Sequence, residues 1–256
     1  MSEPERLTLP ETGSEEELAR MSLFEHLEEL RTRILRSVVV LVLGFFVCFG
    51  FSKQIYRVLA LPIQPYVEKL AFSRVQDPFM IYVKVALLAA VFLTSPLIMW
   101  QVWRFVSPGL YKRERRMAIP FVVLSSGFFI GGGLFGYFIA FPFAVEFLLG
   151  MGDDFEPVIM IGEYLSIQTM ILLGLGVMFQ LPIVIFLLAQ IGVVTPGFLI
   201  RHFRWAVVII FIVAAVITPT PDVVNLCIVA LPTIALYLLG VGAAWVVQRG
   251  KRKRGE

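Results

Sequence analysis

Two carboxylates that stand among basic side chains are the residues best suited to chemistry. Glu114 is the single acid in the run SPGLYKRERRMAIPF and has two basic residues on each side. Glu29 lies in HLEELRTRI, four residues before Arg33, which is the favourable order for an ion pair within a helix. Such carboxylates can bind a cationic ligand, or they can form internal salt bridges, Glu29 with Arg33 and Glu114 with Lys112 or Arg116.

No catalytic motif accompanies these acids. The sequence contains no His-Glu-x-x-His, no Gly-x-Ser-x-Gly and no Walker phosphate loop, and its two histidines are His26 and His202. Cys48 and Cys227 lie in apolar runs without the spacing of metal ligands, so we expect inert thiols, no metal and no other cofactor. The pattern favours a binding protein over an enzyme.

The composition indicates a polytopic membrane protein, because 58% of the 256 residues are hydrophobic and 16% are charged. The mean hydropathy is +0.84.

Six apolar segments can be marked, at residues 34–51, 80–105, 117–148, 165–191, 205–217 and 223–247. Most reach the ~20 residues that a helix needs to cross the membrane. The fifth spans only roughly 20 Å, so it is expected to thin the bilayer locally or to form a partly immersed hairpin with the sixth. The predicted fold is all-α with six transmembrane helices.

The distribution of Lys and Arg predicts that both termini are cytoplasmic. Basic residues flank the first segment, lie between the second and third and between the fourth and fifth, and fill the tail RGKRKRG. Cytoplasmic loops are enriched in Lys and Arg, and the basic link 52–79 is long enough to follow this rule less strictly. We divide the chain into a disordered acidic tail at 1–20, a membrane domain at 21–248 and a basic tail at 249–256. The acidic tail does not resemble a cleavable signal peptide.

The elements that position the two acids are predicted from periodicity and from prolines. Ser14 and Glu17 form a capping-box pattern, and apolar residues then recur at helical spacing as far as Ile34. We expect an amphipathic helix that lies on the cytoplasmic surface and bends into the membrane. Prolines within the spans are expected to kink them into a bent, concave bundle, at Pro96, Pro142, Pro182 and Pro232. Asp222, directly before the sixth apolar segment, is a possible N-cap of its helix.

Two polar residues stand out inside the apolar segments. Lys84 lies within two turns of the start of its segment, where snorkelling to the membrane surface is the simplest interpretation. Gln180 fits a hydrogen bond between two helices and a functional contact equally well.

Five stretches of the chain resemble, in order, the signatures of the TatC family, the multi-span receptor subunit of the twin-arginine protein translocase. They are HLEELRTRI, FVSPGLYKRERR, FPFAVEFL, GVMFQLPIVIF and ITPTPDVVNLCIVALPTIALYL. The resemblance runs from about residue 21 to 237. It implies six spans with both ends in the cytoplasm. It also implies that the chain recognises, at the cytoplasmic face, an N-terminal signal with two adjacent arginines. Folded proteins destined for export carry this signal.

The resemblance implies that Glu29 and Glu114 contact the signal. Successive side chains of an extended peptide point in opposite directions, so each of two neighbouring guanidiniums can meet a carboxylate from a different element. A planar guanidinium makes two parallel hydrogen bonds to a carboxylate, which lysine cannot. Further family positions in or beside this recognition patch are Arg31, Phe105, Pro108, Leu110 and Tyr111.

The resemblance also implies contacts with small single-span subunits of the TatA and TatB kind, and with other copies of the chain, in the bacterial cytoplasmic membrane. Where the family commonly has a glutamate, this chain has Gln180, which keeps hydrogen bonding and loses the ionisable proton. The predicted contact residues are Phe179, Gln180, Pro182, Thr218, Thr220 and Asp222. Energy would come from the proton-motive force, and no nucleic-acid partner is expected.

Two other functions are considered. A small-solute secondary transporter would place several ionisable groups near the bilayer midplane, where this sequence has little beyond Gln180. A membrane scaffold without a ligand would use Glu114 only to neutralise its loop. A scaffold would tolerate Glu114→Gln, whereas a receptor would not.

Overall fold

The computed structural model describes residues 12–67, 70–107, 118–152, 154–155, 157–218 and 222–252, with the backbone alone for 12–24 and 251–252. Regular structure in these residues is helical, apart from an isolated bridge between Ala71 and Met160. The elements are α1 (Thr12–Gly50), α2 (Ser52–Leu59), η1 (Leu61–Ile63), α3 (Asp77–Val106), α4 (Ala118–Phe135), the π-helix η4 (Gly136–Ala140), α5 (Phe141–Gly150), α6 (Ile161–Met178), α7 (Leu181–Ile191), α8 (Pro196–Arg201), α9 (Phe203–Ile217) and α10 (Val223–Arg252).

Five helical stretches among the described residues are long and apolar enough to cross a membrane, at Glu25–Gly50, Asp77–Val106, Ala118–Gly150, Ile161–Ile191 and Val223–Gly250. The apolar helix α9 has 15 residues and is therefore only ~22 Å long. The predicted all-α, polytopic architecture is confirmed, including the short fifth segment.

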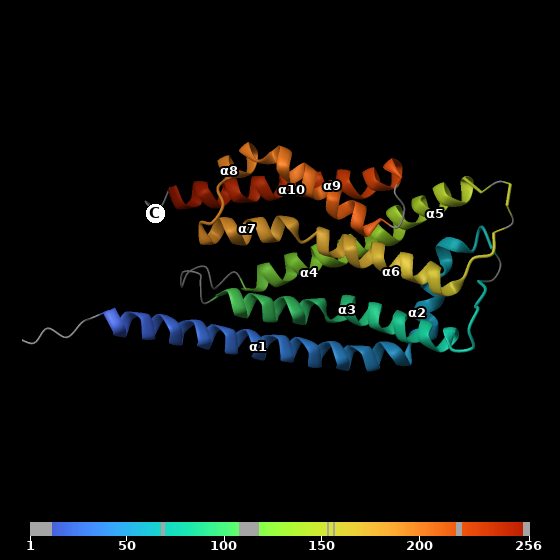
Figure 1. The fold of residues 1–256 in the computed structure, drawn as a ribbon, viewed down its shortest axis with the longest axis horizontal. Helices are drawn as coiled ribbons and strands as arrows, with labels where there is room; N and C mark the ends of the chain where they lie inside the picture. Colours follow the sequence, from blue (N-terminus) through green and yellow to red (C-terminus); the bar gives the residue numbers. More distant parts are fainter. Residues whose placement is uncertain are drawn as a thin grey trace, which may run out of the picture.

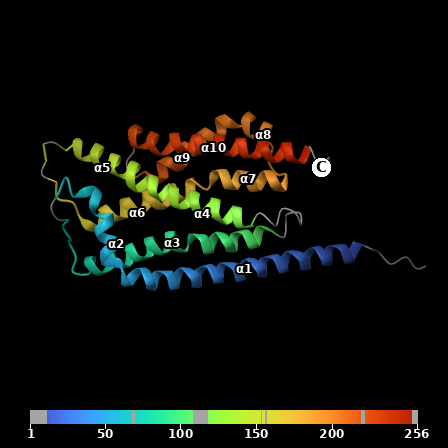
Figure 2. The same ribbon diagram turned by 180° about the vertical axis from the view of Figure 1, so that it is seen from behind.

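The helices stand side by side along one long axis (Figure 1). Helix α1 packs along α3, α3 and α4 contact α6, and α7 packs against α10, with α9 beside it. The view from behind shows the same order, with α1 at one edge and α10 at the other (Figure 2). Helix α1 begins and α10 ends at the same end of the molecule, while α2 and α5 lie at the opposite end.

Helix α1 differs from the prediction. It is a single helix of 39 residues, not a surface helix that bends into the membrane. It also begins at Thr12, so residues 12–20 of the tail expected to be disordered are helical, and residues 1–11 lie outside the described part. No proline occurs between Thr12 and Gly50, so nothing interrupts the hydrogen-bond ladder as the chain passes from polar to apolar residues.

Two of the four prolines break a span, and two do not. Pro142 is the second residue of α5, which directly follows the π-helix η4, and Pro182 is the second residue of α7, which follows a break at residues 179 and 180. Pro96 and Pro232 lie inside the continuous helices α3 and α10. At Pro96 the missing N–H would have bonded to the carbonyl of Phe92, and that carbonyl accepts a bond from Ser95 Oγ at 2.8 Å instead. A neighbouring hydroxyl thus satisfies the freed acceptor.

Close helix contacts and buried hydrogen bonds hold the bundle. Helix α4 lies so close to α6 at Gly132 that a Cβ added there would come within 2.5 Å of the Leu175 carbonyl oxygen. At the end opposite the termini, the carbonyl of Leu59, the last residue of α2, accepts bonds from Tyr164 Oη at 2.8 Å and Gln168 Nε2 at 2.9 Å. Both donors come from α6 and are buried, so they anchor the short helix α2 to the bundle.

Candidate functional site

Glu29 lies on the face of α1 that meets α3, one turn before Arg33. Its Oε1 accepts a charge-assisted bond from Arg33 Nη2 at 2.9 Å, and the two side chains are 31% and 15% exposed, respectively. Arg33 Nη1 also donates to Gln101 Oε1 of α3 at 3.4 Å. The ion pair considered from the sequence is therefore present. Within the described part of the chain, Glu29 Oε2 accepts no hydrogen bond, so half of the carboxylate remains available to a ligand.

A ring stack joins the beginning of this face to the last turn of α3. The His26 ring lies over the Phe105 ring with centroids 4.4 Å apart and planes inclined by 17°. Phe105 is half-buried. His26, Arg33 and Gln101 were not among the site residues predicted from the sequence. The spacing of His26 and Arg33 from Glu29, three and four residues, nevertheless places them on one helix face.

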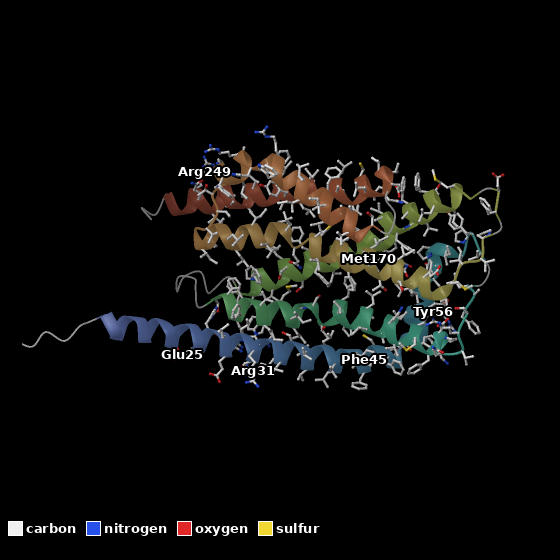
Figure 3. All side chains as sticks on the ribbon, viewed as in Figure 1. Glu25, Arg31, Phe45, Tyr56, Met170 and Arg249 are labelled. Atoms are coloured by element: carbon white, nitrogen blue, oxygen red, sulfur yellow. The ribbon has the colours of Figure 1, made fainter. Side chains whose placement is uncertain are left out.

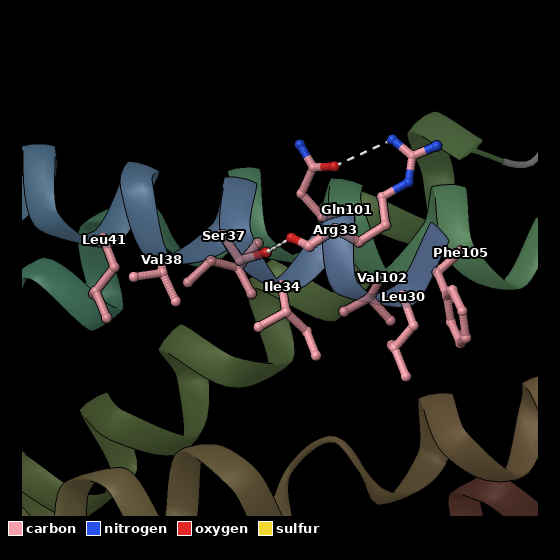
Figure 4. Close-up of a pocket in the computed structure, with 10 residues that line it drawn as sticks. Leu30, Arg33, Ile34, Ser37, Val38, Leu41, Gln101, Val102 and Phe105 are labelled. Carbon is pink, nitrogen blue, oxygen red and sulfur yellow. Dashed lines mark hydrogen bonds between the residues drawn. The ribbon is translucent and has the colours of Figure 1, made fainter. Parts of the chain in front are cut away.

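An apolar pocket of about 240 Å³ lies between α1 and α3 beside the ion pair (Figure 4). Its walls are aliphatic and aromatic, with polar groups only from Arg33, Ser37 and Gln101. Ser37 Oγ donates to the Arg33 carbonyl at 3.0 Å, and Arg33 Nε is buried and has no hydrogen-bond partner among the described residues. The remaining lining residues are Leu30, Ile34, Val38, Leu41, Ile98, Val102 and Phe105. A carboxylate beside an apolar groove suits a ligand that has both a cation and apolar side chains.

Arg31 is not brought to this face. It follows Glu29 by two residues, or ~200° around the helix. Its side chain is exposed and, like that of Glu25, points away from α3 (Figure 3).

The other predicted residues of the recognition patch, Pro108, Leu110, Tyr111 and Glu114, lie outside the described residues. Helix α3 ends at Val106, next to Phe105, and α4 begins at Ala118. Both positions lie at the end of the molecule where α1 begins and α10 ends.

Gln180 lies at the break between α6 and α7, where its side chain is used within the fold. Its Nε2 donates to the backbone carbonyl of Ser125 in α4 at 2.8 Å. Phe179 contacts Phe135 with tilted rings whose centroids are 5.7 Å apart, and Pro182 is buried in the first turn of α7. A hydrogen bond between two helices was one of the two interpretations of Gln180, and this bond is present. A contact with a partner subunit stays a prediction.

The turn between α9 and α10 is also engaged internally. Thr218 is buried and its Oγ1 donates to the Ala214 carbonyl at 2.9 Å. Asp222 was predicted as a possible N-cap, and its Oδ1 accepts from the Asn225 backbone N–H at 2.7 Å, three residues on. Thr220 lies outside the described residues.

The two groups of predicted partner-contact residues lie on neighbouring helices. Ile217, which precedes Thr218, packs directly on Gly174 of α6, where an added Cβ would come within 2.4 Å of its Cγ2 atom. Gly174 precedes Gln180 by six residues, a rise of ~9 Å.

Comparison with known proteins gives one consistent result. A family model described as Sec-independent protein translocase protein (TatC) matches residues 25–232. The chain is 43% identical over 250 residues to the Sec-independent protein translocase protein TatC of Koribacter versatilis, covering 95% of this chain and 92% of that protein. It is 40% identical over 223 residues to the protein of the same name from Helicobacter pylori strain J99, covering 87% and 88% of the two chains.

The fold is similar to a crystal structure described as the twin arginine translocase receptor TatC. The TM-score is 0.77 with 33% sequence identity, and the match covers 87% of this chain and 99% of the solved one.

Proposed function

The chain belongs to the TatC family of Sec-independent protein translocase proteins, a non-enzymatic family of transport components, and we propose that it recognises twin-arginine signal peptides at the cytoplasmic face of the bacterial cytoplasmic membrane. The observation that carries this proposal is the half-buried Glu29 carboxylate, which has one oxygen on Arg33 and lies beside an apolar groove.

In the proposed complex, one signal arginine binds Glu29 and the other binds Glu114. A guanidinium can reach Glu29 Oε2 while Arg33 keeps Oε1, or it can displace Arg33 and take both oxygens. Each charge-assisted bond contributes about 1.5 to 3 kcal/mol, and the partial exposure of Glu29 favours the lower end. Arg33 thus holds the carboxylate in place and discriminates against weaker ligands, because a poor mimic cannot compete with it.

The apolar part of the signal lies along the groove between α1 and α3 in this proposal. The groove is lined almost entirely by apolar side chains, and the ring of Phe105, which lines it, stacks on His26. The predicted residues Pro108, Leu110 and Tyr111 follow Phe105 in the chain, and Arg31 faces solvent on the other side of α1. We assign Arg31 to orientation of α1 at the charged membrane surface.

Both termini are cytoplasmic in this proposal, and small single-span subunits of the TatA and TatB kind dock near the α6–α7 break and the α9–α10 turn. Exposed valines beside these places support the docking surface, at Val177, Val184 and Val216. Further copies of the chain join the assembly, and transport uses the proton-motive force. Gln180 supplies a polar contact and no proton, since an amide does not ionise.

Binding of a fluorescent signal peptide to the full-length protein in nanodiscs tests the receptor function. We expect an Arg-Arg peptide to bind at least about tenfold more weakly to Glu29→Gln and to Glu114→Gln, because each variant loses one charged acceptor. A Lys-Lys peptide should bind weakly to every form.

Glu28→Gln is the matched control. Glu28 is an exposed carboxylate on the same helix, so this variant removes the same charge without changing the proposed site. Equal affinity of native protein, Glu29→Gln and Glu114→Gln for the Arg-Arg peptide would show that the two acids are not the signal clamp.

A further inference from the structure

Lys84 reaches from α3 to the neighbouring helix α6. Its Nζ donates to Ser166 Oγ at 3.2 Å. That hydroxyl gives its own hydrogen to the Gly162 carbonyl at 2.7 Å, so it acts as the acceptor for Lys84. An ammonium group has three donors, so two remain for another ligand.

Lys84 lines a groove of about 470 Å³ that is formed by α3 and α6, with Leu41 from α1. Thr169 lines the same groove, and its hydroxyl makes no hydrogen bond within the described part of the chain. The other lining side chains are apolar and include Leu41, Leu87, Val91, Met170 and Leu173. Figure 3 shows Met170 of α6 in the middle of the molecule, above α3 and α1. The groove therefore offers a positive charge and a hydroxyl, both able to donate hydrogen bonds, in otherwise apolar surroundings.

No carboxylate neutralises this ammonium in the part of the chain that the structure describes. The ion pair found there is that of Arg33 with Glu29 on α1. Glu163, one turn before Ser166, is exposed and makes no ion pair with Lys84. Since an unpaired charge within a span is unfavourable, an anion from outside the chain would stabilise Lys84.

The depth of Lys84 matches that of lipid headgroups. Helix α3 has 30 residues and is ~45 Å long, about 15 Å longer than the hydrocarbon core of a bilayer. If the excess is shared between its ends, the core begins ~7 Å from Asp77, and Lys84 lies ~10 Å from Asp77. The ammonium is then close to the boundary where phosphates of the lipids begin.

From these observations we propose that the groove binds one anionic phospholipid, with its phosphate on Lys84 and Thr169 and an acyl chain along Leu87, Val91, Met170 and Leu173. An anionic phospholipid supplies both an anion at the depth of Lys84 and a thin apolar chain that can lie along the apolar lining of the groove.

Native mass spectrometry of the detergent-purified full chain, titrated with phosphatidylglycerol, phosphatidylcholine or inorganic phosphate, tests this site. We expect the native protein to bind phosphatidylglycerol about tenfold more tightly than the other two probes. Lys84→Gln should remove this preference, Lys84→Arg should retain it, and Thr169→Val should weaken it several-fold. The control is Lys53→Gln, which removes an exposed lysine on α2 that does not line the groove.

Equal binding of both lipids by the native protein, or an unchanged preference in Lys84→Gln, would overturn the proposal. Binding of inorganic phosphate as tight as that of phosphatidylglycerol would show that the acyl chain is not recognised. Copurification with partner subunits covers the remaining case: if Lys84→Gln loses a partner and keeps the lipid preference, Lys84 binds an acidic group of that partner, and the lipid proposal is wrong.

Discussion

Replacing Gly132 with alanine is expected to lower the free energy of unfolding by about 2 kcal/mol or more, since overpacking a tight contact has effects of this size. A Cβ at this position would lie 2.5 Å from the Leu175 carbonyl oxygen and 2.9 Å from Gly176 Cα. These are backbone atoms of α6, so no side chain can rotate away and the two helices must separate. Small residues that allow such close approach are typical of helix contacts in membranes. The thermal unfolding midpoint of the purified protein in one detergent measures the effect.

The neighbouring Gly131 is the matched control for this variant. It lies in the same helix, but a Cβ added there meets no atom within 4 Å. Gly131→Ala should leave the midpoint unchanged or raise it slightly, because alanine favours the helix by roughly 0.5 to 1 kcal/mol. If both alanine variants shift the midpoint equally, the backbone contact between α4 and α6 does not determine stability.

The second large effect is expected at the buried carbonyl of Leu59. Tyr164→Phe combined with Gln168→Leu removes both of its side-chain donors. A buried acceptor left without a partner destabilises a protein by about 1 to 3 kcal/mol, so the double variant should unfold correspondingly more easily. Each single variant leaves one donor in place and should lose less than half as much. Gln168→Leu should be the milder one, because it also removes the buried Oε1, which has no hydrogen-bond partner among the described residues.

A thermodynamic cycle of the two single variants and the double variant measures this coupling in the same unfolding assay. Tyr66→Phe serves as the control, because it removes a phenol hydroxyl from a residue that is 42% exposed. Simple additivity of the two single effects would mean that the Leu59 carbonyl finds another partner or water when it loses both.

Much of the fold could be predicted because it depends on local properties of the chain. Apolar length marks the spans, and α9 was correctly expected to be short. The spacing of Glu29 and Arg33 predicted their ion pair, and Asp222 before an apolar run predicted the cap of α10. Each of these features involves residues close in sequence, where helix geometry alone determines the distance.

Features that depend on distant residues were missed or left open. The His26–Phe105 stack, the bond from Arg33 to Gln101 and the bond from Lys84 to Ser166 each join two helices. Periodicity identifies the face of a helix on which a residue lies, but not which helix that face will meet. The sequence also did not show that α1 would continue unbroken from Thr12 into the membrane.

By itself, the sequence determined that this protein is an all-helical membrane protein and that Glu29 and Glu114 are its candidate ligand-binding acids, because apolar length, charge and ordered motifs are properties of the chain. Only the tertiary structure decided how these and other polar groups are used. It placed Glu29 beside an apolar groove, bound Gln180 to α4 and turned Lys84 toward α6. The physical reason is that a polar group in an apolar environment takes a partner that the packing of distant helices brings within reach.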